Sequence, residues 1–229
     1  MPHCWKDQTA RQCPDPLSHL AATALGTKKK SQQPGEQQRP EVKSQRAEFR
    51  RRAANWLVRH LKWLDETGSQ LNLTRAYGRA LPGERVVEGV PSAYGSNYTL
   101  LGVLGLDGFS APWVLEGALN GDLFKLYVSE VLAPTLRPGD ILLMDNLPTH
   151  KVSGITALVE ARGARVEYLP PYSPDYNPIE RCWSKIKTYL RQAKARTYQE
   201  LIRAIKEALA TISESDIRAW FEFCGYPVH

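Results

Sequence analysis

The chain carries the stretch LPPYSPDYNPIE at residues 169–180. Its four prolines predict a rigid loop, because proline fixes one backbone dihedral and cannot donate a backbone hydrogen bond. Asn177 is a favourable N-cap and Pro178 a favourable first helical residue, so a helix is expected to begin there. Apolar residues recur downstream at helical spacing: Ile179, Cys182, Trp183, Ile186, Tyr189 and Leu190. The stretch therefore predicts a loop that places Glu180 in the first turn of an amphipathic helix.

Strands and helices alternate on the N-terminal side of this loop. Residues 141–144 are unbroken and apolar, which is typical of a strand covered on both faces in a parallel sheet. Residues 98–106 and 109–115 are apolar runs joined by Asp107-Gly108, a hairpin signal. The other expected elements are strands at 58–64 and 165–169, a turn at 65–68, and helices at 122–132 and 152–162. This order predicts an α/β fold with a mixed sheet flanked by helices.

Two more helices are expected after this region. Thr197 with Glu200, and Ser213 with Asp216, form capping-box patterns, in which a hydroxyl and a carboxylate cap the first turn of a helix. We expect an α/β domain over residues 55–195 and a C-terminal helical extension over residues 196–229.

The excess positive charge lies in one segment. The chain of 229 residues has a net charge of +6, and residues 28–52 alone hold nine basic and three acidic residues. We interpret residues 28–54 as a basic linker, in which residues 46–54 form a short helix. A basic arm beside a neutral domain suits a polyanionic partner such as DNA, and a solvated linker is the alternative. Residues 1–27 show no clear period and are expected to be disordered.

Several classes of protein are excluded by composition. No apolar run approaches the roughly 20 residues of a membrane helix, and the first thirty residues lack the apolar core of a secretion signal. The four cysteines form no C-x-x-C pair and no finger-type spacing, which argues against a zinc site and a disulfide framework. We expect reduced thiols, with Cys182 and Cys224 in the core.

Three carboxylates are candidates for a metal site. Asp65 and Asp145 each close a predicted strand, and open sheets place their chemistry at such carboxyl ends. Together with Glu180 they would repel one another, so a cluster of the three predicts a bound cation. Hard oxygen ligands favour Mg²⁺ or Mn²⁺. Two such ions, about 3.5–4 Å apart, would clamp an in-line attack on a phosphodiester.

Each of these carboxylates also has a purely structural interpretation. Asp65 and Asp145 are common residue types in turns after strands. Glu180 stands at the third helical position after Asn177, which is a capping-box pattern. The residues alone leave both interpretations open.

Residues near the carboxylates are candidates for supporting roles. His150 lies five residues after Asp145, where a structural histidine is the alternative. Lys187 and Arg191 share the helix face of Glu180, so they would touch DNA phosphates if Glu180 binds metal; a solvated basic face is the alternative. The full set of expected DNA contacts is Arg50, Arg51, Arg52, Lys185, Lys187 and Arg191.

Three blocks of the sequence resemble a known family. They are Leu64 to Gly68, then Met144 to Leu147 with His150-Lys151, and the proline-rich block of residues 169–180. These blocks are similar to the signatures of bacterial insertion-sequence transposases of the mariner superfamily, also described as DDE superfamily endonucleases. The 34 residues between Asp145 and Glu180 match the spacing typical of that group. The resemblance runs from about residue 28 to residue 226.

The resemblance implies a ribonuclease-H-like domain over residues 55–195 with Asp65, Asp145 and Glu180 as catalytic and metal-binding triad. It implies two Mg²⁺ or Mn²⁺ ions, cleavage by water at transposon ends, and attack of the freed 3′-hydroxyl on target DNA. Asn146, His150 and Asn177 fall in the matching motifs without assigned roles. The implied partners are transposon-end and target DNA and a second copy of the chain, without a membrane or small-molecule cofactor, in a bacterial cytoplasm at the nucleoid.

Two other functions compete with an active transposase. Family members carry a helix-turn-helix region ahead of the basic linker, and residues 1–27 show no two-helix pattern, so we expect that region to be lost or replaced. This would suit a truncated, non-catalytic remnant that binds DNA or inhibits a full-length transposase. A cellular ribonuclease H or Holliday-junction nuclease of the same fold is a third possibility, but it does not explain the proline-rich block.

Overall fold

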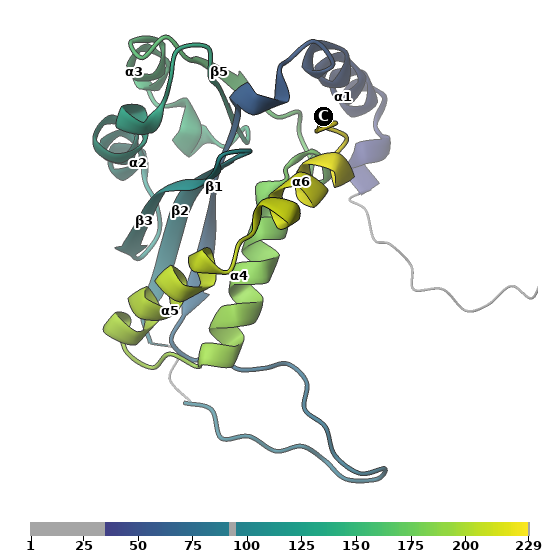
Figure 1. Ribbon diagram of the computed structural model, residues 1–229, viewed down its shortest axis with the longest axis vertical. Coiled ribbons are helices and arrows are strands. Elements are labelled where there is room, and N and C mark those ends of the chain that lie inside the picture. The colour runs from purple at the N-terminus through teal and green to yellow at the C-terminus, as the bar shows by residue number, and fades with distance from the viewer. Residues whose placement is uncertain (1–34, 92–94, 229) are drawn as a thin grey trace, which may run out of the picture. The chain divides into compact units, whose positions relative to one another are not determined.

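Five strands form one sheet in the order β3-β2-β1-β4-β5 in the computed structural model, which describes residues 35–91 and 95–228 (Figure 1). The strands are β1 Leu61–Gln70, β2 Asn97–Gly105, β3 Gly108–Glu116, β4 Ile141–Met144 and β5 Arg165–Tyr168. The hairpin of β2 and β3 is antiparallel, and β1 pairs antiparallel with β2. β4 lies parallel to both β1 and β5. The expected mixed sheet is confirmed.

β1 differs from the strand predicted at residues 58–64. Val58–His60 form a 3-10 turn, and the strand runs on through the residues predicted to form a turn. Only Leu61–Trp63 pair with β4, whereas β1 pairs with β2 from Trp63 onward to Gln70, with Asp65 opposite Gly102. Asp65 therefore stands inside a strand, just past its parallel half, and not at a strand end. Cross-strand hydrogen bonds to β2 override the local turn signal.

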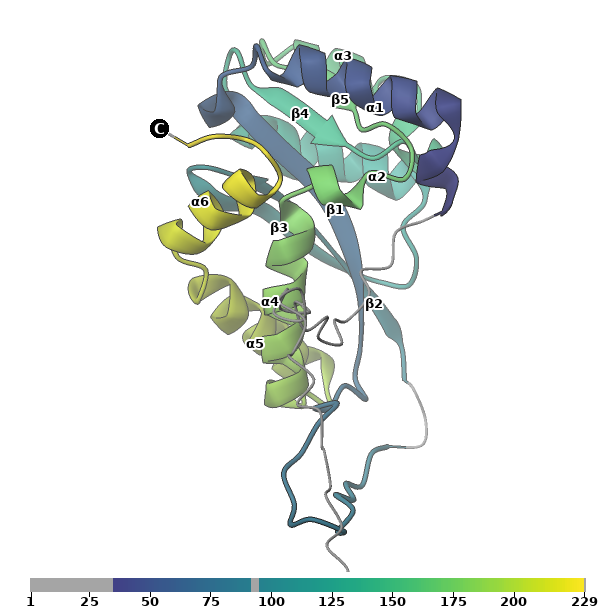
Figure 2. The ribbon, with the colours of Figure 1, turned by 90° about the vertical axis from the view of Figure 1, so that its right-hand side faces the viewer.

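Helices cover both faces of the sheet (Figures 1 and 2). They are α2 Gly121–Tyr127, α3 Ile155–Glu160, α4 Ile179–Ala193, α5 Tyr198–Ala210 and α6 Glu214–Phe223. α2 continues as a π-helical turn, Val128–Leu132, so the helix predicted at 122–132 is present in two parts. α3 is shorter than the predicted 152–162, because Gly154 takes a left-handed conformation (φ 93°) immediately before it.

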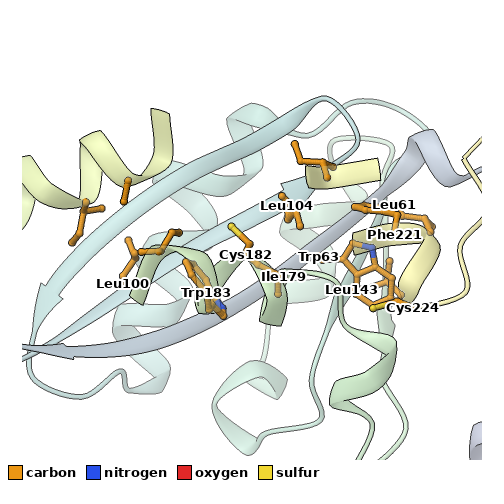
Figure 3. Close-up of a cluster of buried hydrophobic side chains, with 14 of the residues drawn as sticks. Leu61, Trp63, Leu100, Leu104, Leu143, Ile179, Cys182, Trp183, Phe221 and Cys224 are labelled. Atoms are coloured by element: carbon orange, nitrogen blue, oxygen red, sulfur yellow. The ribbon is translucent and has the colours of Figure 1, made fainter. Parts of the chain in front are cut away.

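Each face of the sheet buries its own core, because successive strand residues point to opposite sides. Trp63 of β1 and Leu143 of β4 lie in the core beneath α4, α5 and α6 (Figure 3). Their neighbours Leu64 and Leu142 lie in the opposite core, beneath α2 and α3. The alternation decides which side chains of β1 can reach α4 and which can reach α2.

Side-chain caps begin three of the helices, and two of these caps were expected. The Asn120 side chain accepts a hydrogen bond from the backbone N–H of Leu123 at the start of α2. Both capping boxes form, Thr197 with Glu200 at α5 and Ser213 with Asp216 at α6. These short-range signals were sufficient because the capping hydrogen bonds join residues within a single first turn.

The basic segment is not a linker over residues 40–53. It forms α1, Pro40–Ala53, preceded by a 3-10 turn, Gly35–Gln38. Phe49 is only 2% exposed and stacks on Tyr176 of the proline-rich loop, with ring centroids 5.8 Å apart. The linker prediction fails here because two apolar residues of α1, Val42 and Phe49, are buried. The described residues begin at residue 35. The expected disorder of residues 1–27 and the linker prediction for residues 28–34 therefore lie outside them.

The C-terminal helices belong to the same compact unit as the sheet, which spans residues 34–229. The Tyr226 ring lies 5.0 Å from that of Trp63 on β1 and 6.3 Å from that of Phe221 on α6. Cys182 and Cys224 are buried free thiols, as expected; Cys4 and Cys13 are not described. In the described residues, no helix is both long and apolar enough to cross a membrane.

Candidate active site

Asp65, Asp145 and Glu180 line one pocket of about 380 Å³, although they are far apart in the sequence. Asn146 and Asn177 also line it, and the proline-rich loop forms one wall through residues 169–174. Asp65 comes from the middle of β1, Asp145 follows the end of the neighbouring β4, and Glu180 stands in the first turn of α4. The structure thus brings the three predicted carboxylates together.

Asp65 is held by three donors. Its Oδ1 accepts a hydrogen bond from the backbone N–H of Glu66 at 2.8 Å. Its Oδ2 accepts from Trp183 Nε1 at 3.2 Å and from Asn177 Nδ2 at 3.4 Å. Burial, followed by repulsion from the carboxylates of Glu180, Glu66 and Asp145, raises the pKa of Asp65 to about 8. This carboxylate is fixed in place and surrounded by like charge.

Asp145 makes the turn contact that was considered for it, and it also lines the pocket. Its Oδ1 accepts a hydrogen bond from the backbone N–H of Leu147 at 3.2 Å, which is the expected turn contact after a strand. The same oxygen lies 2.6 Å from Nδ1 of His150. Both contacts involve Oδ1 of Asp145. The carboxylate still lines the pocket.

The capping interpretation of Asn177 and Glu180 is wrong. α4 has no side-chain cap at its N-terminus, because the Asn177 amide points to Asp65 instead of the helix. Glu180 is left facing the pocket. Burial and the nearby Asp145 raise the pKa of Glu180, while Lys187, about two turns along the same helix face, opposes this rise.

His150 is fully buried beside the pocket (0% exposed) and stands between two carboxylates. Its Nδ1 contacts Asp145, and its Nε2–H donates to Glu66 Oε2 at 3.1 Å. Burial by itself lowers the pKa of His150, but the contacts with Asp145 and Glu66 outweigh it and raise the pKa to about 9. The role of Glu66 was missed in the sequence, although strand alternation places its side chain opposite Asp65.

Trp183 was predicted only as a core residue of α4, and it also donates a hydrogen bond to Asp65. Trp183→Phe keeps the ring, which packs edge-on to Phe109, but removes the Nε1 donor. We expect a loss of about 1 kcal/mol in the free energy of unfolding, and a roughly tenfold slower metal-dependent DNA cleavage, the lower end of the effect of a residue that orients a metal ligand. Trp220→Phe on α6 is the matched control. A Trp183→Phe variant that cleaves DNA at the wild-type rate would contradict this role.

Arg46 of α1 clamps the proline-rich loop. Its Nη1 donates to Ser173 Oγ at 2.7 Å and to Asp175 Oδ1 at 3.0 Å, and its Nη2 donates to Asp175 Oδ2 at 2.6 Å. The guanidinium lies 4.1 Å from the centre of the Tyr176 ring. The sequence offered Arg46 only as one positive charge of the basic segment. The pocket wall is therefore tied to a helix more than a hundred residues earlier.

Arg46→Ala should lower the free energy of unfolding by about 1–2 kcal/mol. Charged hydrogen bonds contribute about 1.5–3 kcal/mol, but Asp175 is 45% exposed and solvent screens part of this. A double-mutant cycle with Asp175→Ala, measured by urea denaturation, isolates the pair. Arg51→Ala is the control, because its side chain is 74% exposed and pairs only with Glu48 of its own helix. Equal effects of the two arginine substitutions would show that Arg46 clamps nothing.

The six basic residues expected at DNA fall into two groups. Four have partners in the protein: Lys185 pairs with Asp216 at 2.6 Å, Arg52 with Glu167 at 2.7 Å, Arg51 with Glu48, and Arg50 lies over the Tyr176 ring. Lys187 and Arg191 instead line a groove of about 460 Å³ with Gln70 and Asn97 at the far ends of β1 and β2. Of the six, this pair lies on the Glu180 side of α4.

The donor chemistry of the pocket fits a hard divalent cation. Its acidic side chains are three carboxylates and the Tyr172 phenol, and the buried Asn177 Oδ1 has no hydrogen-bond partner among the described residues. Within residues 35–91 and 95–228, no three His, Cys, Asp or Glu side chains are gathered closely enough to hold a metal ion as they stand. The three carboxylates share the pocket without converging on one point, as expected of like charges.

Solved structures similar to this chain are transposases. The chain matches "Mos1 transposase paired-end complex with left transposon end" with a TM-score of 0.68 and 16% identity, over 90% of this chain and 64% of that one. It matches "Crystal structure of the mariner Mos1 paired end complex with Mg" with a TM-score of 0.66 and 17% identity, over 88% and 65% of the two chains. The chain thus spans about two thirds of these proteins.

A third solved structure and this chain match over most of the length of both. "Crystal structure of the catalytic domain of Mos1 mariner transposase" matches with a TM-score of 0.59 and 14% identity, over 86% of this chain and 91% of that one. At these identities the likeness establishes the fold, and the expected ribonuclease-H-like class is confirmed. None of the curated proteins compared matches the sequence.

A protein-family model supplies the evidence from sequence. The model described as DDE superfamily endonuclease matches residues 60–202, which is more than half of the chain. The match contains all three pocket carboxylates and the whole proline-rich loop. The chain belongs to the DDE superfamily endonuclease family.

Proposed function

We propose that this chain is the catalytic part of a DNA transposase, which cuts DNA and joins the freed 3′ end to target DNA with the help of divalent metal ions. The observation that carries the proposal is the meeting of Asp65, Asp145 and Glu180 in one pocket, inside the region that matches the endonuclease family. Carboxylates brought together from β1, β4 and α4 have no structural partner that would explain all three.

The residues of the chain would divide the work as follows. Asp65, Asp145 and Glu180 would hold two Mg²⁺ or Mn²⁺ ions, which when bound supply an activated water and stabilise the leaving oxygen. Trp183 and Asn177 keep the Asp65 carboxylate turned toward the pocket. Asn146 lines the pocket near Asp145, where a side-chain amide could hydrogen-bond to a phosphate oxygen.

DNA is the proposed substrate and partner. The similar structures include complexes of Mos1 transposase with a transposon end, and paired-end complexes of it with Mg and with Mn. For this chain, we infer that duplex DNA lies across the pocket and follows α4 past Lys187 and Arg191. Arg50, Arg51 and Arg52 of α1 are weaker candidates, since each contacts another side chain. A dimer that pairs two DNA ends stays a prediction.

The test is DNA cleavage by the purified chain. Labelled duplexes that carry the ends of the element are incubated with Mg²⁺, with Mn²⁺, and with a chelator. We expect strand breaks that leave 3′-hydroxyl ends in either metal and none with the chelator, together with joined products when target DNA is added. Absence of cleavage on every duplex, or equal cleavage with the chelator, would overturn the proposal. The first outcome would favour a non-catalytic remnant that only binds DNA.

A further inference from the structure

A chain of contacts through a buried histidine lies behind the pocket, on the side away from α4. Adjacent residues of a strand point to opposite faces of the sheet, so Glu66 faces α2 while Asp65 faces α4. Glu66 does not line the pocket. Its Oε2 accepts from His150 Nε2, and the other ring nitrogen of His150 lies 2.6 Å from Asp145. The imidazole therefore connects Glu66, on one face of β1, to a carboxylate of the pocket.

The histidine is fixed from several sides. Its ring lies 4.6 Å from that of Phe124 in α2, and its backbone carbonyl accepts a hydrogen bond from the Tyr168 hydroxyl at 3.2 Å. The ring is completely buried, so it cannot turn without breaking these contacts. In the described part of the chain, the Glu66 side chain has His150 as its one polar partner. Apart from its charge, which contributes to the raised pKa of Asp65, the Glu66 side chain is thus connected to the pocket through the imidazole.

We propose that Glu66 and His150 are positioning residues, which hold the Asp145 carboxylate in the orientation needed to bind a divalent cation. The inference rests on the proposed function, because it concerns the same pocket. Residues that orient metal ligands through a hydrogen bond typically change metal affinity or activity by about 10–100-fold when they are replaced. A histidine that only fills space would need neither carboxylate.

Two substitutions of His150 separate its two contacts. His150→Asn keeps a donor near the Nδ1 position, beside Asp145, whereas His150→Gln keeps one near the Nε2 position, beside Glu66. The readout is the affinity for Mn²⁺ alone, measured by calorimetry on the full chain, with the fold checked by thermal melting. We expect His150→Gln to weaken Mn²⁺ binding about 10–100-fold, and His150→Asn to weaken it less.

Glu66→Gln provides a variant that does not alter the buried ring. It should weaken Mn²⁺ binding by about tenfold in the wild-type background, and have no further effect in the His150→Asn background, because asparagine cannot reach Glu66. His60→Asn is the matched control: His60 lies 3.6 Å from Asp140, far from the pocket in the fold, and its replacement should leave Mn²⁺ affinity unchanged.

The outcomes separate this inference from the proposed function. Wild-type Mn²⁺ affinity in folded Glu66→Gln, or equal affinities of His150→Asn and His150→Gln, would overturn the inference and leave the proposed function intact. If the wild-type chain itself binds no Mn²⁺, the proposed function fails and the inference fails with it. Additive losses from Glu66→Gln and His150→Asn would also overturn it, because Glu66 would then act by another route.

Discussion

Asp145→Ala is expected to slow metal-dependent DNA cleavage by about a thousandfold. Metal ions contribute several kcal/mol of charge stabilisation in the transition state, and about 4 kcal/mol corresponds to a factor of roughly one thousand in rate. Asp145 is held by a hydrogen bond from the backbone N–H of Leu147 and by its contact with His150. We expect no other side chain to take over this position. The measurement is the single-turnover rate of strand cleavage in Mg²⁺ with enzyme in excess over DNA.

The matched control for this substitution is Asp122→Ala. Asp122 is an exposed aspartate in the first turn of α2, and it does not line the pocket. Its loss should cost less than about 1 kcal/mol of stability through the helix dipole and leave the cleavage rate near that of the wild type. If Asp145→Ala cleaved DNA as fast as Asp122→Ala does, Asp145 would have no part in the chemistry.

Phe221→Ala is expected to lower the free energy of unfolding by about 3–5 kcal/mol, as large aromatic deletions in a core do. Phe221 of α6 is completely buried and contacts Tyr226, which in turn packs on Trp63 of β1. A loss of this size is a large share of the roughly 5–15 kcal/mol that stabilises a typical domain. The C-terminal helices should thus be required for the fold of the strand that carries Asp65.

Phe223→Ala, two residues later on the same helix, provides the comparison. Phe223 is 64% exposed, and its described partner is the guanidinium of Arg181, 3.5 Å from the ring centre. Its removal should cost at most about 1 kcal/mol, the contribution of an exposed cation–π contact. Urea denaturation of Phe221→Ala and Phe223→Ala measures the loss of stability in each variant. Similar midpoints for the two would mean that α6 is an appendage and not part of the core.

Much of the fold could be predicted because its signals are local. The hairpin at Asp107-Gly108, the apolar strand Ile141–Met144 and the capping boxes of α5 and α6 each depend on residues within a few positions of one another. The end of β1 could not be predicted in this way. Residues 65–68 have the composition of a turn, but pairing with β2 carries the strand through them to Gln70.

The pocket carboxylates could be predicted, whereas the contacts that hold them could not. Asp65, Asp145 and Glu180 stand in recognisable motifs, and the fold brings them together. Their supports join residues that are distant in the sequence: Glu66 and His150 are 84 positions apart, and Asp65 and Trp183 are 118 apart. No periodicity or spacing identifies such pairs, because they depend on how β1 lies against α4 and α2.

The two interpretations of Glu180 stayed open in the sequence because one local pattern allowed two structures. Asn177 and Glu180 have the spacing of a capping box, and in isolation the asparagine side chain would turn to the helix. In the fold, the Asn177 amide N–H donates to Asp65 on β1, and this turns the Asn177 side chain away from the first turn of α4. The start of α4 is left to Pro178, and Glu180 remains at the pocket.

The central claim is that Asp65, Asp145 and Glu180 together bind the divalent cations, and the position of Mn²⁺ tests it most directly. Crystals of the chain are soaked in Mn²⁺, and anomalous scattering locates the metal. We predict anomalous peaks in the pocket, within coordination distance of carboxylate oxygens from all three residues. Peaks elsewhere, or a pocket without a peak at a Mn²⁺ concentration that supports cleavage, would contradict it.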